Sequence, residues 1–178
     1  LLGAYRYDRY KTNPEERPPL DRLTVIFNQR SRAESVQKGV EAGRISAAGA
    51  NLARDLSNAP GNKLPPRKLA SKAREMSKSY DLKCEILTRE NITKEKMGAL
   101  LAVSAGSEEP PRFIILEYGE PSDDYDTIVF VGKGITFDSG GISLKPGSGM
   151  EEMKHDMSGA AAVVGAMRAI GEMKPPLH

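Results

Sequence analysis

The sequence contains no tryptophan, a single cysteine and no long apolar run. One cysteine, Cys84, excludes a disulfide framework within the chain and is typical of a protein from a reducing compartment. Charged side chains recur throughout residues 1–20, so this stretch does not have the pattern of a secretory signal peptide. No segment is apolar enough for a transmembrane helix. We therefore expect a cytoplasmic protein without a membrane partner.

The sequence also lacks a large excess of charge of either sign. Its 26 Lys and Arg residues and 24 Asp and Glu residues leave a formal net charge of +2. That balance is too small for the basic stripe that nucleic-acid binding requires. A hydrophobic fraction of 39% and a charged fraction of 28% are typical of a globular protein with an ordinary core. Composition therefore argues against a nucleic-acid partner and predicts a folded chain.

Helical and strand patterns alternate along the chain. Helices are predicted at 31–58, from Pro66 to Tyr80, in a short segment that ends at Gly98, and at 157–173. Ser31 and Glu34 form a capping-box pattern at the start of the first of these helices. Short strands are predicted at 23–27 and 82–87, and apolar runs occur at 99–105, 113–117 and 127–132. The last run fits a central strand buried on both faces. The pattern predicts an α/β fold with a mixed, largely parallel sheet flanked by helices.

The same pass along the chain divides it into three parts. Residues 1–30, which begin like the end of a helix, are interpreted as the tail of an N-terminal α/β domain. Residues 31–58 form a connecting helix, and residues 59–178 form the first part of a second domain. Glycines at 39, 43 and 49 each cost the helix about 1 kcal/mol relative to alanine. We expect another element to pack closely against that helix face.

Charged residues gather where the apolar run at 127–132 ends. Lys133 and Asp138 follow this run, and Asp156 stands at the start of the last helix. Ligand sites of α/β sheets lie at the carboxyl ends of strands, and charges next to a buried strand are costly unless they are paired or bound to a metal. Gly140 and Gly141 permit a sharp turn that would bring Lys145 back to the same place. This segment is the candidate site.

A lysine binds a metal only when it is neutral. Deprotonation at neutral pH costs roughly 4 to 5 kcal/mol, which a metal site worth about 10 to 16 kcal/mol can offset. Asp138 has two oxygens and could bridge two cations, and Asp156 offers a second carboxylate or a helix N-cap. Without a metal, Lys133 would form a salt bridge with Asp138. The spacing of these residues leaves both interpretations open.

The segments VGKGITFDSGGISLKP and MEEMKHDMSGAA closely resemble the first metal-site segment of the leucine aminopeptidase (cytosol aminopeptidase) family of two-metal exopeptidases. The resemblance extends from about residue 31 to residue 175. It implies that Lys133, Asp138 and Asp156 are metal ligands, with Asp138 bridging. It also implies that Lys145 is the catalytic cation that polarises the scissile carbonyl, that Met153 lines the pocket for the first side chain, and that Lys145 and Asp156 contact substrate.

The resemblance implies an activity as well as a site. Members of this family release N-terminal amino acids from peptides, with Leu preferred, and use two divalent ions. Zinc and manganese are the expected ions, with magnesium and cobalt as alternatives. A cytoplasmic homo-hexamer acting on peptides is the assembly that the resemblance implies.

The chain departs from the family pattern in one respect. The family carries a second motif, resembling Asn-Thr-Asp-Ala-Glu-Gly-Arg, which supplies two more carboxylate ligands and an Arg that holds a bicarbonate, and no such motif occurs before His178. We therefore expect residues 59–178 to be the incomplete first part of the catalytic domain of a longer protein. By itself this chain is expected to be inactive and to bind metal weakly or not at all.

Four other interpretations of the chain compete with this one. Phe137 to Gly141 resembles the nucleophile segment of chymotrypsin-like proteases, but the histidines, His155 and His178, both follow Ser139, and the upstream helices do not suit a β-barrel. Gly132-Lys-Gly134 fits neither common phosphate-binding motif. His155 is expected to lie outside the ligand set. A DNA-binding accessory role, as in some bacterial relatives, and an inert folded piece remain as alternatives.

Overall fold

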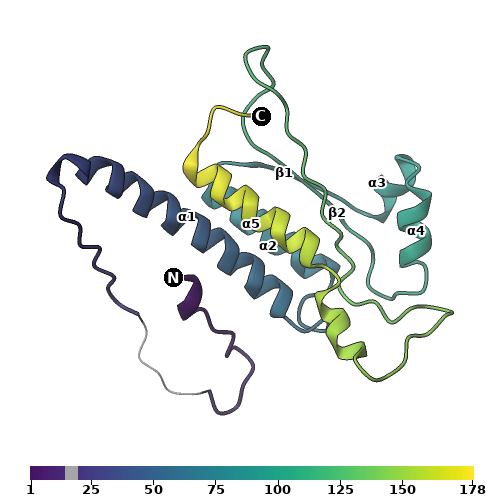
Figure 1. Ribbon diagram of the computed structural model, residues 1–178. Coiled ribbons are helices and arrows are strands. Elements are labelled where there is room, and N and C mark those ends of the chain that lie inside the picture. The colour runs from purple at the N-terminus through teal and green to yellow at the C-terminus, as the bar shows by residue number, and fades with distance from the viewer. Residues whose placement is uncertain (15–19) are drawn as a thin grey trace.

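The computed structural model describes residues 1–14 and 20–178 (Figure 1). In these ranges the α-helices are α1 (Ala33–Asn58), α2 (Pro66–Ser79), α3 (Arg89–Lys94), α4 (Gly98–Ser104) and α5 (Ser158–Met173). The strands are β1 (Lys83–Leu87) and β2 (Phe113–Glu117), and short 3-10 helices are η1 (Leu2–Ala4), η2 (Arg30–Arg32) and η3 (Met150–His155). This is a mixed α/β fold, as the sequence predicts.

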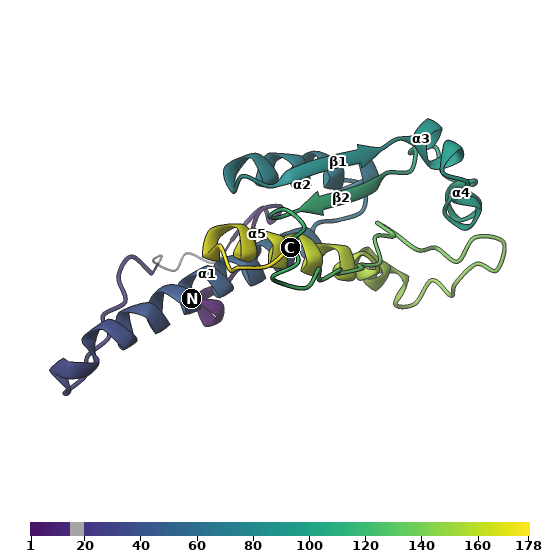
Figure 2. The same ribbon diagram turned by 90° about the horizontal axis from the view of Figure 1, so that it is seen from above.

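The core lies where α1, α2 and α5 meet. The helices α1 and α5 run side by side, and α2 covers one face of the β1–β2 pair (Figures 1 and 2). Ala73 of α2 and Ala161 of α5 are fully buried, and Met157 is almost so at 1% exposure. The small side chains of the two alanines allow the helix axes to approach. Packing of α5 in this core fixes the segment that precedes it, which includes Asp156.

Helix α2 shows how local sequence produces an amphipathic element. Pro66 occupies the first helical position, where its missing N–H has no intrahelical partner to lose. The buried side chains recur three or four residues apart, which is the spacing of one helix face: Leu69, Ala70, Ala73, Met76 and Ser77. That face covers the sheet. The sequence prediction of a helix from Pro66 to Tyr80 is confirmed to within one residue.

Close packing of α1 against α5 depends on two glycines. A Cβ added at Gly49 would lie 2.5 Å from the carbonyl oxygen of Gly165, and a Cβ at Gly165 would lie 2.5 Å from the oxygen of Gly49. The expected close packing is therefore confirmed at Gly49. It is wrong at Gly39 and Gly43, where an added Cβ would meet nothing within 4 Å among residues 1–14 and 20–178. The N-terminal half of α1 extends beyond α5 and the strands (Figure 2).

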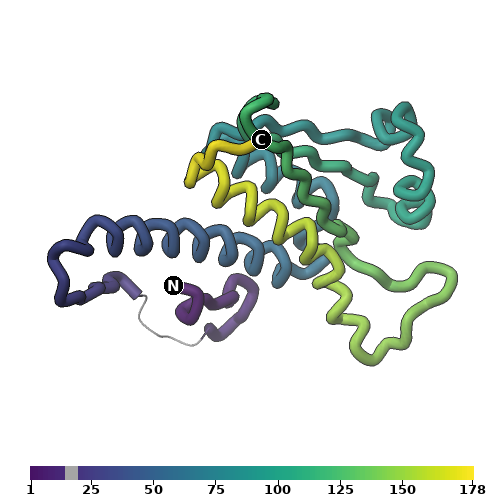
Figure 3. Tube along the Cα trace, turned by 45° about the horizontal axis from the view of Figure 1, so that its top comes forward, coloured from purple at the N-terminus to yellow at the C-terminus, as the bar shows by residue number. Residues whose placement is uncertain are grey.

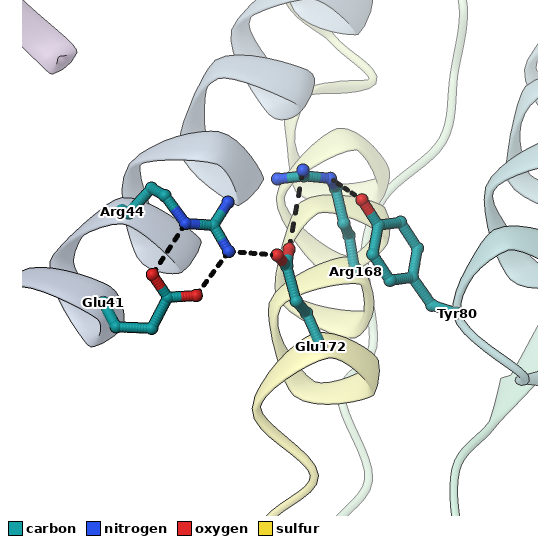
Figure 4. Close-up of polar contacts among 5 residues, drawn as sticks. All are labelled: Glu41, Arg44, Tyr80, Arg168 and Glu172. Atoms are coloured by element: carbon teal, nitrogen blue, oxygen red, sulfur yellow. Dashed lines mark hydrogen bonds and ion pairs between the residues drawn. The ribbon is translucent and has the colours of Figure 1, made fainter. Parts of the chain in front are cut away.

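A polar network joins the same two helices farther from the core (Figure 4). Arg44 of α1 binds Glu41, with 2.9 Å between Nε and Oε2, and also binds Glu172 of α5. Arg168 donates from Nε to the hydroxyl oxygen of Tyr80 at 3.0 Å and lies 3.6 Å from Glu172. The pair of Arg44 with Glu41 is exposed and contributes little stability by itself, whereas Arg168 and Glu172 are largely buried. The network sets the relative position of α1, α5 and the end of α2.

The predicted largely parallel sheet is not confirmed. Within the described residues β1 and β2 pair antiparallel, with Lys83 opposite Glu117 and Leu87 opposite Phe113. Residues 127–132 are not assigned to a strand, and Val131 is 92% exposed rather than buried on both faces. Extended backbone becomes a sheet strand only when a neighbour completes its hydrogen-bond ladder. Here one such bond is present, from the N–H of Ile128 to the oxygen of His178 at 2.8 Å.

The apolar run at 99–105 lies largely in helix α4, because Ala and Leu favour a helix; the period of so short a run does not distinguish a helix from a strand. Other local predictions need correction. Residues 23–27 lie outside regular structure and are exposed, and the start of the chain holds only η1. Arg32, not Ser31, precedes α1, and it makes no side-chain cap, so the predicted capping box is absent.

The division into domains remains a prediction. Part of the segment assigned to an N-terminal domain, residues 15–19, lies outside the described residues. Helix α1 spans nearly the range proposed for the connecting helix. Among the described residues, none of the helices combines the length and apolarity needed to cross a membrane.

Candidate functional site

Two glycines bring Lys133 next to the start of α5. A Cβ at Gly132 would lie 2.4 Å from the carbonyl oxygen of Gly159, so side chains are excluded from this contact. The carbonyl of Lys133 then accepts the N–H of Ala160 at 2.8 Å. The first N–H groups of a helix have no partner inside it, and Lys133 supplies one. As a result the side chain of Lys133 reaches Asp156, with 2.9 Å between Nζ and Oδ1.

A glycine turn brings Lys145 back toward Asp138, as the sequence predicts. Gly140 and Gly141 have φ values of 95° and 72°, which glycine adopts without strain. The N–H of Lys145 donates to the carbonyl of Ser139 at 2.9 Å and closes the turn. Lys145 Nζ then lies 3.2 Å from Asp138 Oδ2. The loop that contains this turn projects away from the helices, before the chain returns through η3 (Figure 3).

The pairing of charges differs from the pairing expected without a metal. The spacing predicted a salt bridge between Lys133 and Asp138, whereas Lys133 pairs with Asp156 and Asp138 pairs with Lys145. The contact between Gly132 and Gly159 explains the difference, because it directs Lys133 toward the segment before α5. The structure therefore brings all four predicted polar residues into two ion pairs.

The electrostatics of Asp138 link the two ion pairs. The N–H of Gly140 donates to Asp138 Oδ1 at 2.8 Å, and this hydrogen bond is the main cause of a pKa below the usual range. The charges of Lys145 and, more weakly, Lys133 lower the pKa of Asp138 further. Lys133 therefore lies close enough to act on both carboxylates. Asp138 is ionised at neutral pH, which is the form that binds a cation.

One oxygen of Asp156 has no hydrogen-bond partner in the part of the chain that the structure describes. The Asp156 side chain is only 18% exposed, and Oδ2 is buried without such a partner, while Oδ1 contacts Lys133. A buried acceptor without a donor is costly, and native structures contain few of them. A divalent cation prefers carboxylate oxygens and would satisfy this atom. Asp138, Asp156 and a neutral Lys133 therefore fit a metal, with one unused oxygen already in place.

Other residues from the sequence analysis lie near these groups or apart from them. Met153 lies on η3 and is half-buried, and its role in a substrate pocket stays a prediction. Within the described ranges, no group of three His, Cys, Asp or Glu side chains is placed to hold a metal, so the candidate set has two carboxylates and a lysine. His155 contacts Ser57 of α1, with 2.8 Å between Nδ1 and the Ser57 carbonyl oxygen. Ser57 was not identified from the sequence, because it contacts a residue 98 positions away.

Two curated proteins and one solved structure match this chain over nearly its whole length. The probable cytosol aminopeptidase of Roseiflexus castenholzii is 47% identical over 180 residues, which is 100% of this chain and 37% of the relative. That of Nitrosococcus oceani is 48% identical over 178 residues, or 99% of this chain and 36% of the relative. The solved structure described as the bottromycin maturation enzyme BotP in complex with Mn matches at a TM-score of 0.81 and 40% identity, covering 99% of this chain and 35% of that one.

The chain thus spans little more than a third of the length of the curated relatives it matches. The family model described as "Cytosol aminopeptidase family, catalytic domain" matches residues 51–178, which contain all four residues of the two ion pairs. The chain therefore belongs to the cytosol aminopeptidase family.

Proposed function

We propose that the whole protein containing this chain is a metal-dependent aminopeptidase that releases N-terminal amino acids from peptides, with Leu preferred, by two-metal hydrolysis. The observation that carries this proposal is the ion pair of Lys133 with Asp156, whose Oδ2 has no partner among the described residues, together with the charge effect of Lys133 on Asp138. Membership of the cytosol aminopeptidase family supports it. Zinc or manganese is the proposed ion, with magnesium and cobalt as alternatives, and the structural relative BotP is described in complex with Mn.

The ligands divide between the two ion pairs. Lys133 as a neutral amine, Asp138 as a bridge and Asp156 would hold the ions, which supply Lewis acidity and a lowered pKa for a bound water. Asp138 is already ionised, because the Gly140 N–H and Lys145 favour its charged form. Lys133 would have to lose its proton to solvent before it could bind a metal. The charge of Asp156, which the Lys133 ammonium now neutralises, would then be neutralised by a divalent ion.

Lys145 supplies the positive charge for the reaction itself. Its backbone is held to Ser139, and Pro146 follows it, so the side chain starts from a fixed position. An ammonium placed at the scissile carbonyl stabilises the negative charge that develops on its oxygen. We propose that Asp138 releases Lys145 for this role when its oxygens bind ions. Met153 would line the pocket for the first side chain, and Asp156 would face the substrate's amino-terminal residue.

The proposed activity requires a free α-amine on the substrate. With the whole protein, we expect hydrolysis of leucine p-nitroanilide and much slower hydrolysis of its N-acetyl derivative, because acetylation removes the positioning group. Release of p-nitroaniline measures both rates. Chelation should abolish the reaction, and added manganese or zinc should restore it. Equal rates on both substrates, or a rate insensitive to chelator, would contradict the proposal.

The 178-residue chain by itself should be inactive and bind metal weakly. The chain supplies three ligands, and one of them is a lysine that must lose its proton. Three ligands do not complete the coordination of two metal ions. Calorimetric titration with manganese tests the binding, and the p-nitroanilide assay tests turnover. Chelator-sensitive hydrolysis by this chain alone would overturn the expectation.

We further propose that the whole protein acts in the cytoplasm as a homo-hexamer with peptide substrates. The net charge of the chain does not support the DNA-binding alternative, because a net charge of +2 provides no basic stripe. A salt-dependent gel shift would test that alternative directly.

A further inference from the structure

A ring of hydrogen bonds joins the end of α1 to the junction between η3 and α5. The Nδ1 atom of His155 lies 2.8 Å from the carbonyl oxygen of Ser57 and 3.1 Å from its Oγ. The Oγ atoms of Ser57 and Ser158 are 2.6 Å apart, and Ser158 Oγ donates to the carbonyl oxygen of His155 at 2.6 Å. Ser57 lies 98 positions before His155 in the chain. We call this group the His155 ring.

Only one arrangement of protons satisfies the whole ring. The Ser57 carbonyl can only accept, so Nδ1 of His155 carries a hydrogen and donates it. Ser158 uses its own hydrogen on the His155 carbonyl, so the hydroxyl of Ser57 donates to Ser158. Ser57 lies in the last turn of α1, where carbonyl groups lack intrahelical partners, and His155 supplies one. Because Nδ1 is a donor, it does not act as a base toward the Ser57 hydroxyl.

The His155 ring holds the backbone on both sides of Asp156, at His155 and at Ser158. His155 precedes Asp156, and Met157, which follows it, is buried in the core at 1% exposure. Both neighbours of Asp156 are therefore held, one by α1 through hydrogen bonds and the other by packing. The Asp156 side chain leaves this fixed segment with Oδ1 on Lys133 and Oδ2 unpartnered. A carboxylate with a free oxygen is useful to a cation only if its position is maintained.

We propose that His155 is a positioning residue that holds Asp156 in place for a divalent cation, acting through the Ser57 carbonyl. This inference rests on the proposed function, because it assumes that Asp156 is a ligand. His155 itself stays outside the ligand set and acts on the cation only through the backbone of its neighbour. Interactions that orient a ligand in this way affect metal affinity without touching the metal.

The test is the affinity of the whole protein for Mn²⁺, measured by electron paramagnetic resonance of the free ion and by calorimetry. His155→Phe retains a ring but has no donor, and we expect it to weaken Mn²⁺ binding by about 10- to 100-fold. His155→Asn places an amide N–H near the position of Nδ1 and should retain the wild-type affinity. Ser158→Ala removes two links of the ring with a smaller change of shape, and it should weaken binding in the same direction.

Arg44→Met is the matched control for general loosening of α1 against α5. It removes the ion pair with Glu172 at a different contact between the same helices, and should lower thermal stability but not Mn²⁺ affinity. Wild-type affinity in both His155→Phe and Ser158→Ala would overturn the inference and leave the proposed function standing. Equal losses in Arg44→Met, or no rescue by His155→Asn, would also overturn it. Absence of Mn²⁺ binding by the wild-type protein would instead reject the proposed function, and this inference with it.

Discussion

Replacing Lys145 with methionine in the whole protein is expected to lower kcat by about 10²- to 10³-fold, which is the typical effect of removing one group that stabilises a developing oxyanion. Methionine preserves most of the apolar stem and removes only the charge. The effect should fall mainly on kcat, because the interaction strengthens as the carbonyl oxygen becomes negative. Steady-state rates on leucine p-nitroanilide measure it.

The loss must be separated from unfolding and from the change in net charge. The ion pair between Lys145 and Asp138 is partly exposed, at 37% and 30%, so its removal should change the thermal midpoint little. Lys72→Met provides a matched control, since it also removes one positive charge and one exposed ion pair, here with Glu75 on α2. It should leave kcat unchanged. A Lys145→Met enzyme within a few-fold of the wild-type rate would remove Lys145 from the proposed mechanism.

Gly49→Ala is expected to reduce the free energy of unfolding of this chain by about 1 to 3 kcal/mol, the usual cost of overpacking a close contact. The added Cβ would lie 2.5 Å from the backbone oxygen of Gly165. A backbone atom cannot turn aside as a flexible side chain can, so α1 and α5 would have to separate. Gly165→Ala should have a similar effect, because its Cβ would meet the oxygen of Gly49 at the same distance. Denaturant unfolding followed by circular dichroism measures both.

Helix α1 also provides a control substitution, for which the expected change in the free energy of unfolding has the opposite sign. Gly43 is exposed, and among the described residues no atom of another element lies within 4 Å of an added Cβ. Gly43→Ala should therefore raise the free energy of unfolding by up to about 1 kcal/mol, through helix propensity alone. If Gly49→Ala also stabilised the chain, the close packing of α1 and α5 would be wrong.

The elements that the sequence predicted well are those that depend on neighbouring residues. Helix α2, strand β1 and helix α5 lie close to their predicted positions, because proline at a helix start and a repeated apolar spacing act within one segment. The errors occur where an element needs a distant partner. Residues 127–132 have the composition of a buried strand, yet their state depends on which segment pairs with them. Sheet pairing is not encoded in a local pattern.

The candidate site divides in the same way. The sequence by itself pointed to Lys133, Asp138, Lys145 and Asp156 as candidate residues. It also determined the return of Lys145, because a pair of glycines turns the chain within a few residues. Only the tertiary structure decided that Lys133 pairs with Asp156 and Asp138 with Lys145. It also placed Ser57 against His155. The physical reason is that backbone conformation is set locally, whereas ion pairs and buried hydrogen bonds depend on which helices pack together.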